Sequence, residues 1–387
     1  MKRVMIPLGI VAAGAVALLL GLELLLRAAD ISAPWWYQPD RTLGWTLRPG
    51  LSGWFTDEGT SFVQTNAAGQ RDREHALDKP QDVYRIAVLG DAFSEGMQVA
   101  LEQTYWALLP ERLESCGFQP GRRIEVLNFG VRSYGTAQAY LMLQTTAVRY
   151  RPDLVLLQFT NGNDVRDNSF ALDPKRQERP FFVLDGQGGL ELENSFGSSP
   201  TFVKRLSSSH EVLRKVSDRS RALQLVRRAT ELELMGRAHA QSTANEAGLE
   251  IEVLAAPRDA LWKEAWQITE GLIARIGEFA LRNGAKLAVV TVPYAMQVHP
   301  DVALRESLQA KYGVPDLAYP DRRVASFARR NGMLAIMLAP EMQALAVATG
   351  SYLYGFENSV LGFGHWNQLG HRTAAEIIAR RLCADRA

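Results

Sequence analysis

The sequence predicts an α/β fold in which one parallel sheet lies between two layers of helices. Five short apolar segments alternate along the chain with five longer amphipathic segments, which is the order of a doubly wound parallel sheet. The short segments are apolar throughout, so we expect strands that are covered on both faces. They occupy residues 86–89, 124–127, 154–159, 287–292 and 333–338.

The amphipathic segments predict the helices of the two outer layers. Their apolar residues recur at helical spacing over residues 104–116, 136–149, 262–283, 322–330 and 368–382. In a sheet of this type the carboxyl ends of the strands form one edge, and ligands bind there. We therefore expect the functional residues just after the predicted strands.

One long segment interrupts the alternation between the third and fourth predicted strands. We interpret residues 168–256 as an insertion, with a hairpin around residues 185–189 and a basic helix over residues 212–228. Long segments beside this edge of a sheet are usually lids or partner surfaces. For the basic helix, a solvated face and contact with an anionic ligand or lipid headgroup are both open.

The N-terminus predicts a membrane anchor within residues 1–30. Residues 4–22 carry no charge and follow Lys2 and Arg3, and a helix of that length matches the hydrocarbon core of about 30 Å. The positive-inside rule keeps Lys2 and Arg3 in the cytoplasm. We expect a single-pass protein of the bacterial inner membrane with a periplasmic C-terminal domain. A cleaved signal peptide is the alternative, although its apolar part is usually only about 7 to 15 residues long.

Residues 31–80 are rich in Gly, Pro and Trp and lack helical periodicity, which predicts short strands joined by turns. We call this region the collar. Its aromatic residues Trp35, Trp36 and Tyr37 fit either a membrane-interface belt or a packed cluster. The chain then divides into an anchor (1–30), the collar (31–80) and an α/β domain (81–387).

Composition limits the function classes. The chain has 387 residues, 47% of them hydrophobic, and its 43 basic and 42 acidic side chains give a net charge of +1. Without a strong positive field we expect no nucleic-acid partner. His365 and His371 have no neighbouring His or carboxylate that would complete a ligand set, so we expect no metal. No phosphate-binding glycine motif follows a strand, so we expect no nucleotide or other cofactor. The sequence identifies no protein partner.

Four short segments at the predicted strand ends carry the chemistry. Residues 90–96 read GDAFSEG, 128–135 read NFGVRSYG, 161–164 read NGND, and 364–371 read GHWNQLGH. In this order they resemble the motif blocks of the SGNH (GDSL-type) ester hydrolases, and the resemblance runs over residues 84–382. It implies a flavodoxin-like, three-layer α/β/α fold and a site for acyl transfer.

The resemblance assigns roles to four residues. Position 92 is that of the nucleophile, and His365 is the general base. The backbone N–H groups of Ala92 and Ser133 and the side chain of Asn163 form the oxyanion hole. Such a constellation works because the base removes the nucleophile's proton while fixed donors stabilise the negative oxygen of the intermediate.

Three positions depart from the family pattern. Ala92 has no nucleophilic oxygen, and Ser94, two residues later, should point elsewhere. Ser133 replaces a glycine. Gly362 stands where the acid that orients His365 is expected, so that Glu357, Asp164 or a backbone carbonyl would have to serve. Ala92 is either native or an engineered substitution, and the other two departures favour a native difference.

Three functions remain open at this point. The first is ester hydrolysis or acyl transfer on O-acylated envelope glycans by a site that lacks its serine. The second is a non-catalytic glycan-binding or assembly protein of the cell envelope. The third is a structural membrane protein with a vestigial site. The expected ligand is an acylated carbohydrate or a small ester, and the expected membrane contact is the N-terminal helix.

The two cysteines provide a test of topology. In a sheet of strand order 2-1-3-4-5 the first and last helices lie side by side, and Cys116 and Cys383 close those two helices. An oxidising compartment would let them bond. We predict a disulfide, with two unpaired thiols as the alternative.

Overall fold

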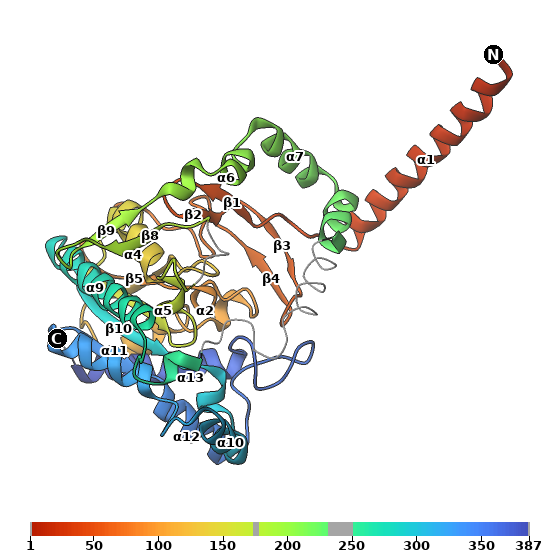
Figure 1. Ribbon diagram of the computed structural model, residues 1–387. Helices are drawn as coiled ribbons and strands as arrows, with labels where there is room; N and C mark the ends of the chain where they lie inside the picture. Colours follow the sequence, from red (N-terminus) through yellow and green to blue (C-terminus); the bar gives the residue numbers. More distant parts are fainter. Residues whose placement is uncertain (1, 173–177, 231–250, 386–387) are drawn as a thin grey trace.

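The computed structural model describes residues 2–172, 178–230 and 251–385 (Figure 1). Its centre is a five-stranded sheet in the order β11-β10-β7-β5-β6, in which every neighbouring pair is parallel. Numbered along the sheet, this is the predicted order 2-1-3-4-5. The strands are β5 (Val83–Leu89), β6 (Arg123–Asn128), β7 (Leu154–Thr160), β10 (Lys286–Val292) and β11 (Leu334–Met337).

The α/β domain has the expected three layers. Every residue of β5 and β7 is buried, because helices cover both faces of the sheet. One apolar core lies between the sheet and α4 (Thr136–Thr145), α9 (Ala260–Arg282) and α11 (Tyr319–Arg330). A second core lies between the opposite face and α3 (Leu109–Ser115), α12 (Ala339–Thr349) and α13 (Gln368–Asp385).

Several helices differ from the prediction, and two of them are shorter than expected. The helix expected over residues 104–116 begins only at Leu109, because Pro110 occupies its first turn and residues 101–103 form the short 3-10 helix η1 (Leu101–Gln103). The helix expected over residues 136–149 ends at Thr145 and is followed by the 3-10 turn η2 (Ala147–Tyr150). Both α12 and α10 (Val302–Tyr312) were not predicted.

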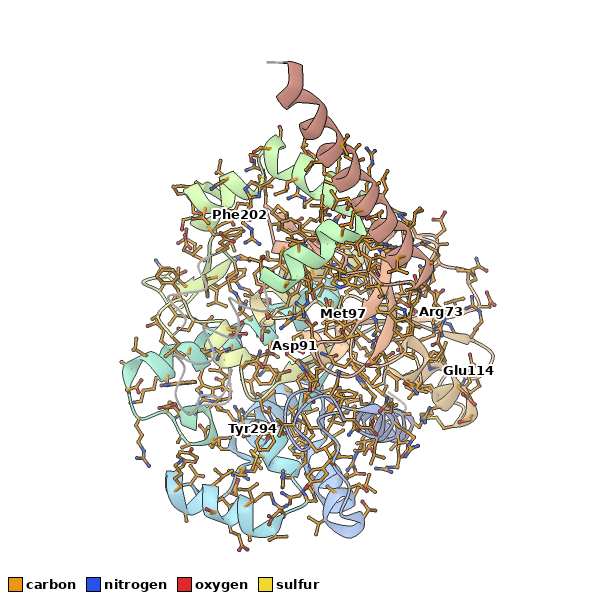
Figure 2. All side chains as sticks on the ribbon, turned by 90° about the vertical axis from the view of Figure 1, so that its right-hand side faces the viewer. Arg73, Asp91, Met97, Glu114, Phe202 and Tyr294 are labelled. Carbon is orange, nitrogen blue, oxygen red and sulfur yellow. A yellow bond between two sulfur atoms is a disulfide. The ribbon has the colours of Figure 1, made fainter. Side chains whose placement is uncertain are left out.

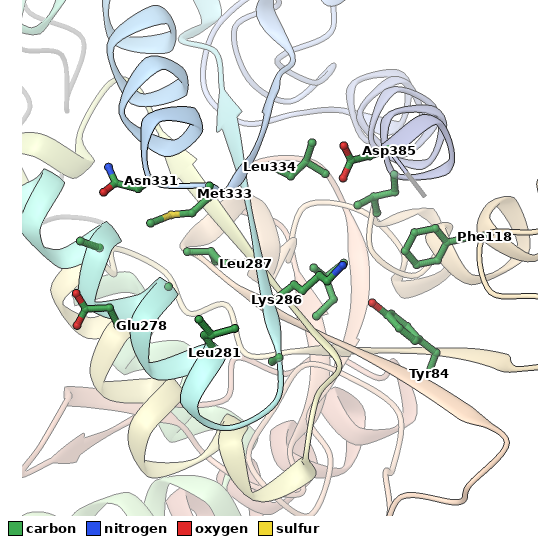
Figure 3. A pocket seen from close by; sticks show the side chains of 16 residues that line it. Tyr84, Phe118, Glu278, Leu281, Lys286, Leu287, Asn331, Met333, Leu334 and Asp385 are labelled. Atoms are coloured by element: carbon green, nitrogen blue, oxygen red, sulfur yellow. The ribbon is translucent and has the colours of Figure 1, made fainter. Parts of the chain in front are cut away.

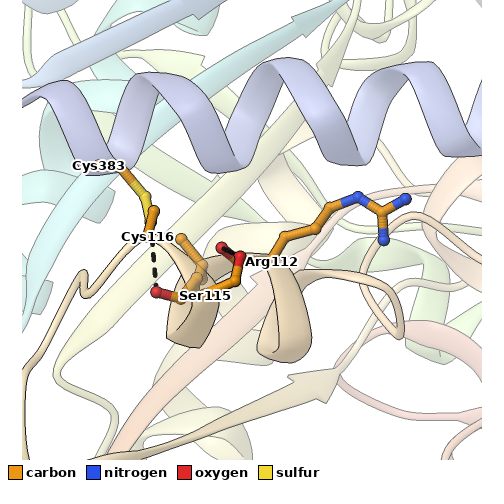
Figure 4. Close-up of a disulfide and its surroundings, with 5 residues drawn as sticks. Arg112, Ser115, Cys116 and Cys383 are labelled. Carbon is orange, nitrogen blue, oxygen red and sulfur yellow. Dashed lines mark hydrogen bonds between the residues drawn. A yellow bond between two sulfur atoms is a disulfide. The ribbon is translucent and has the colours of Figure 1, made fainter.

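The disulfide is confirmed. Cys116 and Cys383 are bonded, with their Cα atoms 6.3 Å apart across 267 residues of sequence. Cys116 caps α3, and Cys383 lies near the end of α13, which packs beside α3 (Figure 4). The bond therefore ties the first and last helices of the α/β domain together.

The collar consists of two antiparallel pairs. β1 (Tyr37–Asp40) pairs with β2 (Gly44–Leu47), and β3 (Ser52–Phe55) pairs with β4 (Ser61–Gln64). Trp36 and Tyr37 pack against a small core of the collar, and the guanidinium of Arg227 lies 5.2 Å from the ring centroid of Trp35. These aromatic residues thus form a packed cluster, which was one of the two interpretations.

The insertion contains the expected hairpin, made by β8 (Phe181–Leu184) and β9 (Leu190–Glu193). After the short helices η3 (Ser195–Ser198) and α6 (Pro200–Arg205), the basic stretch forms two helices instead of the single one predicted over residues 212–228. α7 (Ser208–Arg219) ends at Ser220, whose extended backbone breaks the helix, and residues 221–230 form the next helix. Residues 231–250 of the expected insertion lie outside the described residues.

The N-terminal residues form α1 (Lys2–Ala28), which projects from the rest of the chain (Figure 1). Exposed apolar residues line its second half, including Leu18, Leu20 and Leu24. Within the described ranges, no helix combines the length and the hydropathy that crossing a bilayer requires.

Candidate active site

The site begins where β5 turns into the short helix α2 (Ala92–Glu95). Asp91 caps this helix, because its Oδ1 accepts a hydrogen bond from Phe93 N at 3.0 Å while its Oδ2 accepts one from Thr160 Oγ1 at 2.8 Å. Figure 2 labels Asp91 in the interior of the domain. Ala92, the first residue of α2, is 6% exposed. The position predicted for the nucleophile is therefore buried at the start of α2 and bears only a methyl group.

Ser94 does not replace the missing nucleophile. Its Oγ lies 2.7 Å from the hydroxyl of Tyr105 and donates a hydrogen bond to Gln158 Oε1 at 2.9 Å. The residue is fully buried. Its hydroxyl thus belongs to the interior, as expected from its place in the turn.

The second motif block lies directly against the first. Val131 N donates to Gly90 O at 3.1 Å, and a Cβ on Gly130 would lie 2.4 Å from Ser94 Cβ, so that only glycine permits this approach. Ser133 has φ +61°, the left-handed conformation that glycine adopts without strain. Its carbonyl accepts a hydrogen bond from Arg179 Nη2 at 2.6 Å. Ser133 therefore has a backbone conformation that favours glycine, at the position where the family resemblance predicts one.

The third block follows β7. Asn163 is half-buried at the start of α5 (Asp164–Asp167), and its Nδ2 donates to Asp167 Oδ2 at 3.1 Å. Because one N–H of the Asn163 amide is bonded to Asp167, a hydrogen bond to an oxyanion would have to come from the other N–H of Nδ2. Asp164 is buried and accepts a hydrogen bond from Thr160 N at 3.2 Å, and burial raises its pKa well above the ordinary value.

His365 has a carboxylate partner, and that partner is Glu58 of the collar. Glu58 Oε2 lies 2.5 Å from His365 Nδ1, and Glu58 Oε1 accepts a hydrogen bond from His365 N at 2.7 Å. A ring that donates through Nδ1 leaves Nε2 available as a base, which is the arrangement of the histidine in serine hydrolases. The ring also packs on Phe93 of α2, with centroids 5.2 Å apart.

Electrostatics keep Glu58 charged. Burial opposes ionisation of this carboxyl, but hydrogen bonds from His365 and the positive charge of Arg132 outweigh it and lower the pKa of Glu58 below its ordinary value. Glu58 is therefore a carboxylate that can stabilise a protonated His365.

None of the three predicted ways of orienting His365 is correct. Glu357 is exposed to solvent, and Asp164 is bonded within its own loop. His365 Nδ1 is bonded to Glu58 instead of a backbone carbonyl. Gly362 has φ +84°, and a Cβ there would lie 2.7 Å from His299 Nε2. His299 thus occupies the space that an acid at position 362 would need, and the carboxylate enters from the collar instead.

Two residues of the C-terminal loop hold Glu58 in place. Asn358 Oδ1 accepts from Gly59 N at 2.8 Å, while Asn358 Nδ2 donates to Gly59 O at 2.9 Å. At Gly364, with φ +78°, a Cβ would lie 2.1 Å from Glu58 Oε1. The absence of a side chain at Gly364 lets the carboxylate reach His365.

A second buried carboxyl lies on α2. Glu95 is 2% exposed and accepts hydrogen bonds from the hydroxyl of Tyr37, at 3.0 Å to Oε1 and 2.9 Å to Oε2. Burial raises its pKa to about 7, although hydrogen bonds from Tyr37 and from the backbone of Arg132 act in the opposite direction. Glu95 joins the collar to the end of α2.

These residues form no metal site, and a cavity of the domain lies away from them. Throughout the described part of the chain, no group of three or more His, Cys, Asp or Glu side chains could hold a metal ion. A cavity of about 400 Å³ lies at the opposite, amino-terminal edge of the sheet, between Tyr84, Leu287 and Met333 (Figure 3).

Comparisons with known proteins concern the fold. No model of a known protein family matches the chain, and no curated protein is similar to it. Similar solved structures include a GDSL-like lipase from Bacteroides thetaiotaomicron, which is 12% identical with a TM-score of 0.34 over 80% of this chain and 91% of that chain. A catalytic mutant of an acetylxylan esterase from Geobacillus stearothermophilus is 10% identical, with a TM-score of 0.39 over 77% and 94% of the two chains. We base the function below on the site residues.

Proposed function

We propose that this site binds acyl esters, as an SGNH hydrolase does, but forms no acyl-enzyme because position 92 lacks a hydroxyl. The observation that carries the proposal is the hydrogen-bonded pair of Glu58 and His365, whose ring packs on Phe93, the residue after Ala92. A charged, partly buried carboxylate on Nδ1 orients a histidine for general-base catalysis.

Each residue has a defined part in this proposal. The ester carbonyl lies over the start of α2 and receives hydrogen bonds from the backbone N–H groups of Ala92 and Ser133 and from the side chain of Asn163. In this proposal His365 Nε2 would accept the proton of a nucleophile at position 92. Glu58 fixes the ring and stabilises its protonated form. With a hydroxyl at position 92, the same residues would complete acyl transfer.

We further propose that the ligand is an acylated carbohydrate or a small ester of the cell envelope. The alternative is a non-catalytic glycan-binding or assembly protein that uses the same site. Ala92 favours this alternative, since the residues that bind an ester remain while the attacking atom does not.

We also propose that α1 attaches the chain to the bacterial inner membrane, with the α/β domain outside the cytoplasm. The uncharged run of residues 4–22 after Lys2 and Arg3 supports this orientation. The bond between Cys116 and Cys383 supports an oxidising compartment, since disulfides persist there.

The test of the ester site is Ala92→Ser. We expect the natural chain to be almost inert on p-nitrophenyl acetate and the variant to hydrolyse it at least about 100-fold faster, because loss of the serine costs serine hydrolases more than that. The matched control is Ala280→Ser, on α9 at the amino-terminal edge of the sheet, which should stay inert. A folded Ala92→Ser variant as inert as the natural chain would overturn the proposal, and so would natural activity that survives His365→Ala.

A further inference from the structure

Helices α6 and α7 of the insertion lie on the side of the domain from which α1 projects (Figure 1). This part of the insertion carries a row of exposed apolar side chains. Each of these side chains is between 46% and 65% exposed, although large aliphatic residues are usually buried. We call the row the α6–α7 surface. It consists of Val203, Val212, Leu213, Val216, Leu223 and Val226.

The contacts of α7 explain why this row points outward. Val212 and Val216 are four residues apart, and Leu213 and Val216 are three apart, so the three side chains lie on adjoining parts of one side of the helix. A different part of the helix faces the protein: Asp218 accepts two hydrogen bonds from Arg48 of the collar, at 3.0 and 2.5 Å. The polar side is thus fixed to the collar and the apolar side is left to the surroundings.

The α6–α7 surface continues into the end of α1. Glu23 of α1 accepts hydrogen bonds from Arg221 N at 3.0 Å and from Ala222 N at 3.2 Å. Arg27 Nη2 donates to Arg219 O at 2.6 Å. Leu24 and Leu25 beside these contacts are 68% and 65% exposed. Anything that surrounds the end of α1 therefore also meets the insertion.

The same segment concentrates positive charge. Residues 200–230 contain eight Lys or Arg residues and only two acidic residues, whereas the whole chain has a net charge of +1. Lys204, Lys215 and Arg219 are exposed next to the apolar row. Apolar side chains flanked by cations are the composition of helices that lie in the interface of an anionic bilayer.

We propose that the α6–α7 surface lies on the membrane, with its apolar row among the acyl chains and its cations on anionic phospholipid headgroups. The inference rests on the proposed attachment by α1 but not on the chemistry at Ala92. It gives the α/β domain a fixed orientation above the bilayer, because α1 and the insertion would contact the membrane together.

The test uses the full chain in vesicles of phosphatidylethanolamine and phosphatidylglycerol. A thiol introduced by Leu213→Cys carries an environment-sensitive fluorophore, and the native cysteines do not react because they are bonded to each other. The matched control is Leu281→Cys on α9, where the side chain is 73% exposed. We expect lipids with a doxyl group on the acyl chain to quench the label at position 213 several-fold more than the label at position 281.

The outcomes separate the two proposals. A chain that does not float with the vesicles would contradict attachment by α1. A chain that floats but shows equal quenching at positions 213 and 281 would overturn only the α6–α7 surface. Shielding of the label at position 213 in detergent without lipid would indicate contact with a second copy of the chain, and would also overturn the inference.

The proposed contact between the cations and anionic headgroups is tested separately. Lys204→Glu together with Lys215→Glu should reduce quenching at position 213 in the phosphatidylglycerol vesicles, and low salt should enlarge the difference. The matched pair Lys263→Glu and Lys311→Glu, on α9 and α10, should change nothing. Equal quenching of the natural surface in pure phosphatidylcholine vesicles would overturn the preference for anionic lipid.

Discussion

The loops at the strand ends and the turn that carries Glu58 reach the same site in different ways. The loops that hold Ala92 and Asn163 follow strands buried at every position, so the sheet itself fixes where they lie. The turn of the collar is placed by hydrogen bonds with Asn358, 299 residues away. A site can therefore take its main residues from topology and its supporting carboxylate from a tertiary contact.

The largest expected effect comes from removing the carboxylate that the collar supplies to His365. In the Ala92→Ser background, Glu58→Gln should lower kcat by up to about 10⁴-fold, the scale of the corresponding change in serine proteases. The reason is that a neutral amide neither fixes the Nδ1 proton nor stabilises the protonated ring. Stopped-flow or steady-state ester hydrolysis measures it. Glu357→Gln, at an exposed acid, is the matched control, and an equal loss there would contradict the role of Glu58.

Removing the disulfide tests how firmly the α/β domain, which carries the strand-end loops, is held together. Cys116→Ser with Cys383→Ser should lower the free energy of unfolding by about 4 to 5 kcal/mol, less any strain, because the bond closes a loop of 267 residues. Urea unfolding of the variant and of the natural chain gives the difference. A change below about 1 kcal/mol would mean that the packing of α3 against α13 alone fixes the first and last helices.

Glu95, which joins α2 to Tyr37 of the collar, should make the stability of the folded chain depend on pH. Its pKa is about 7 in the folded chain, because of burial, against 4.5 for an ordinary glutamate. Between these values the folded chain holds a proton that the unfolded chain has released, so stability should fall as pH rises from 4.5 to 7, by up to about 3 kcal/mol. Glu95→Gln should remove this slope in thermal unfolding, whereas Glu102→Gln, at an exposed acid, should keep it. An unchanged slope in Glu95→Gln would exclude Glu95 as its source.

Asn358→Ala should have the smallest effect on stability, about 1 to 2 kcal/mol. Asn358 is exposed, and the substitution removes its hydrogen bonds with Gly59 and Thr56. In the Ala92→Ser background it should also lower kcat, since the turn that carries Glu58 loses its support. Asn331→Ala, which removes one exposed bond to Phe327 O, should leave kcat unchanged. Equal kcat values in both variants would show that Asn358 does not position Glu58.

Much of the α/β domain follows from local sequence. Strands buried on both faces are continuous apolar runs, so β7 is recognised within a residue of its end, and the strand order then brings Cys116 to Cys383. α12 was missed because apolar residues occur all round it and leave no helical stripe.

Glu58 could not be predicted in the same way. It lies in an acidic turn of the collar whose sequence is typical of any hairpin turn. In addition, 307 residues separate it from His365. Two signals were present: Gly362 lacks the expected acid, and Gly364 leaves space beside His365. Neither says which distant carboxylate fills that space, because only the packing of the collar on the C-terminal loop decides it.

The most direct test of the Glu58–His365 pair is the protonation of the His365 ring in the natural chain. Nitrogen and proton NMR of histidine-labelled protein, assigned with His365→Gln, reports which ring nitrogen carries the proton. We predict that Nδ1 carries a proton whose signal lies far downfield because it is bonded to Glu58, and that Glu58→Gln abolishes this signal. A ring without a proton on Nδ1, or a downfield signal that survives Glu58→Gln, would contradict the assignment of His365 as a base oriented by the collar.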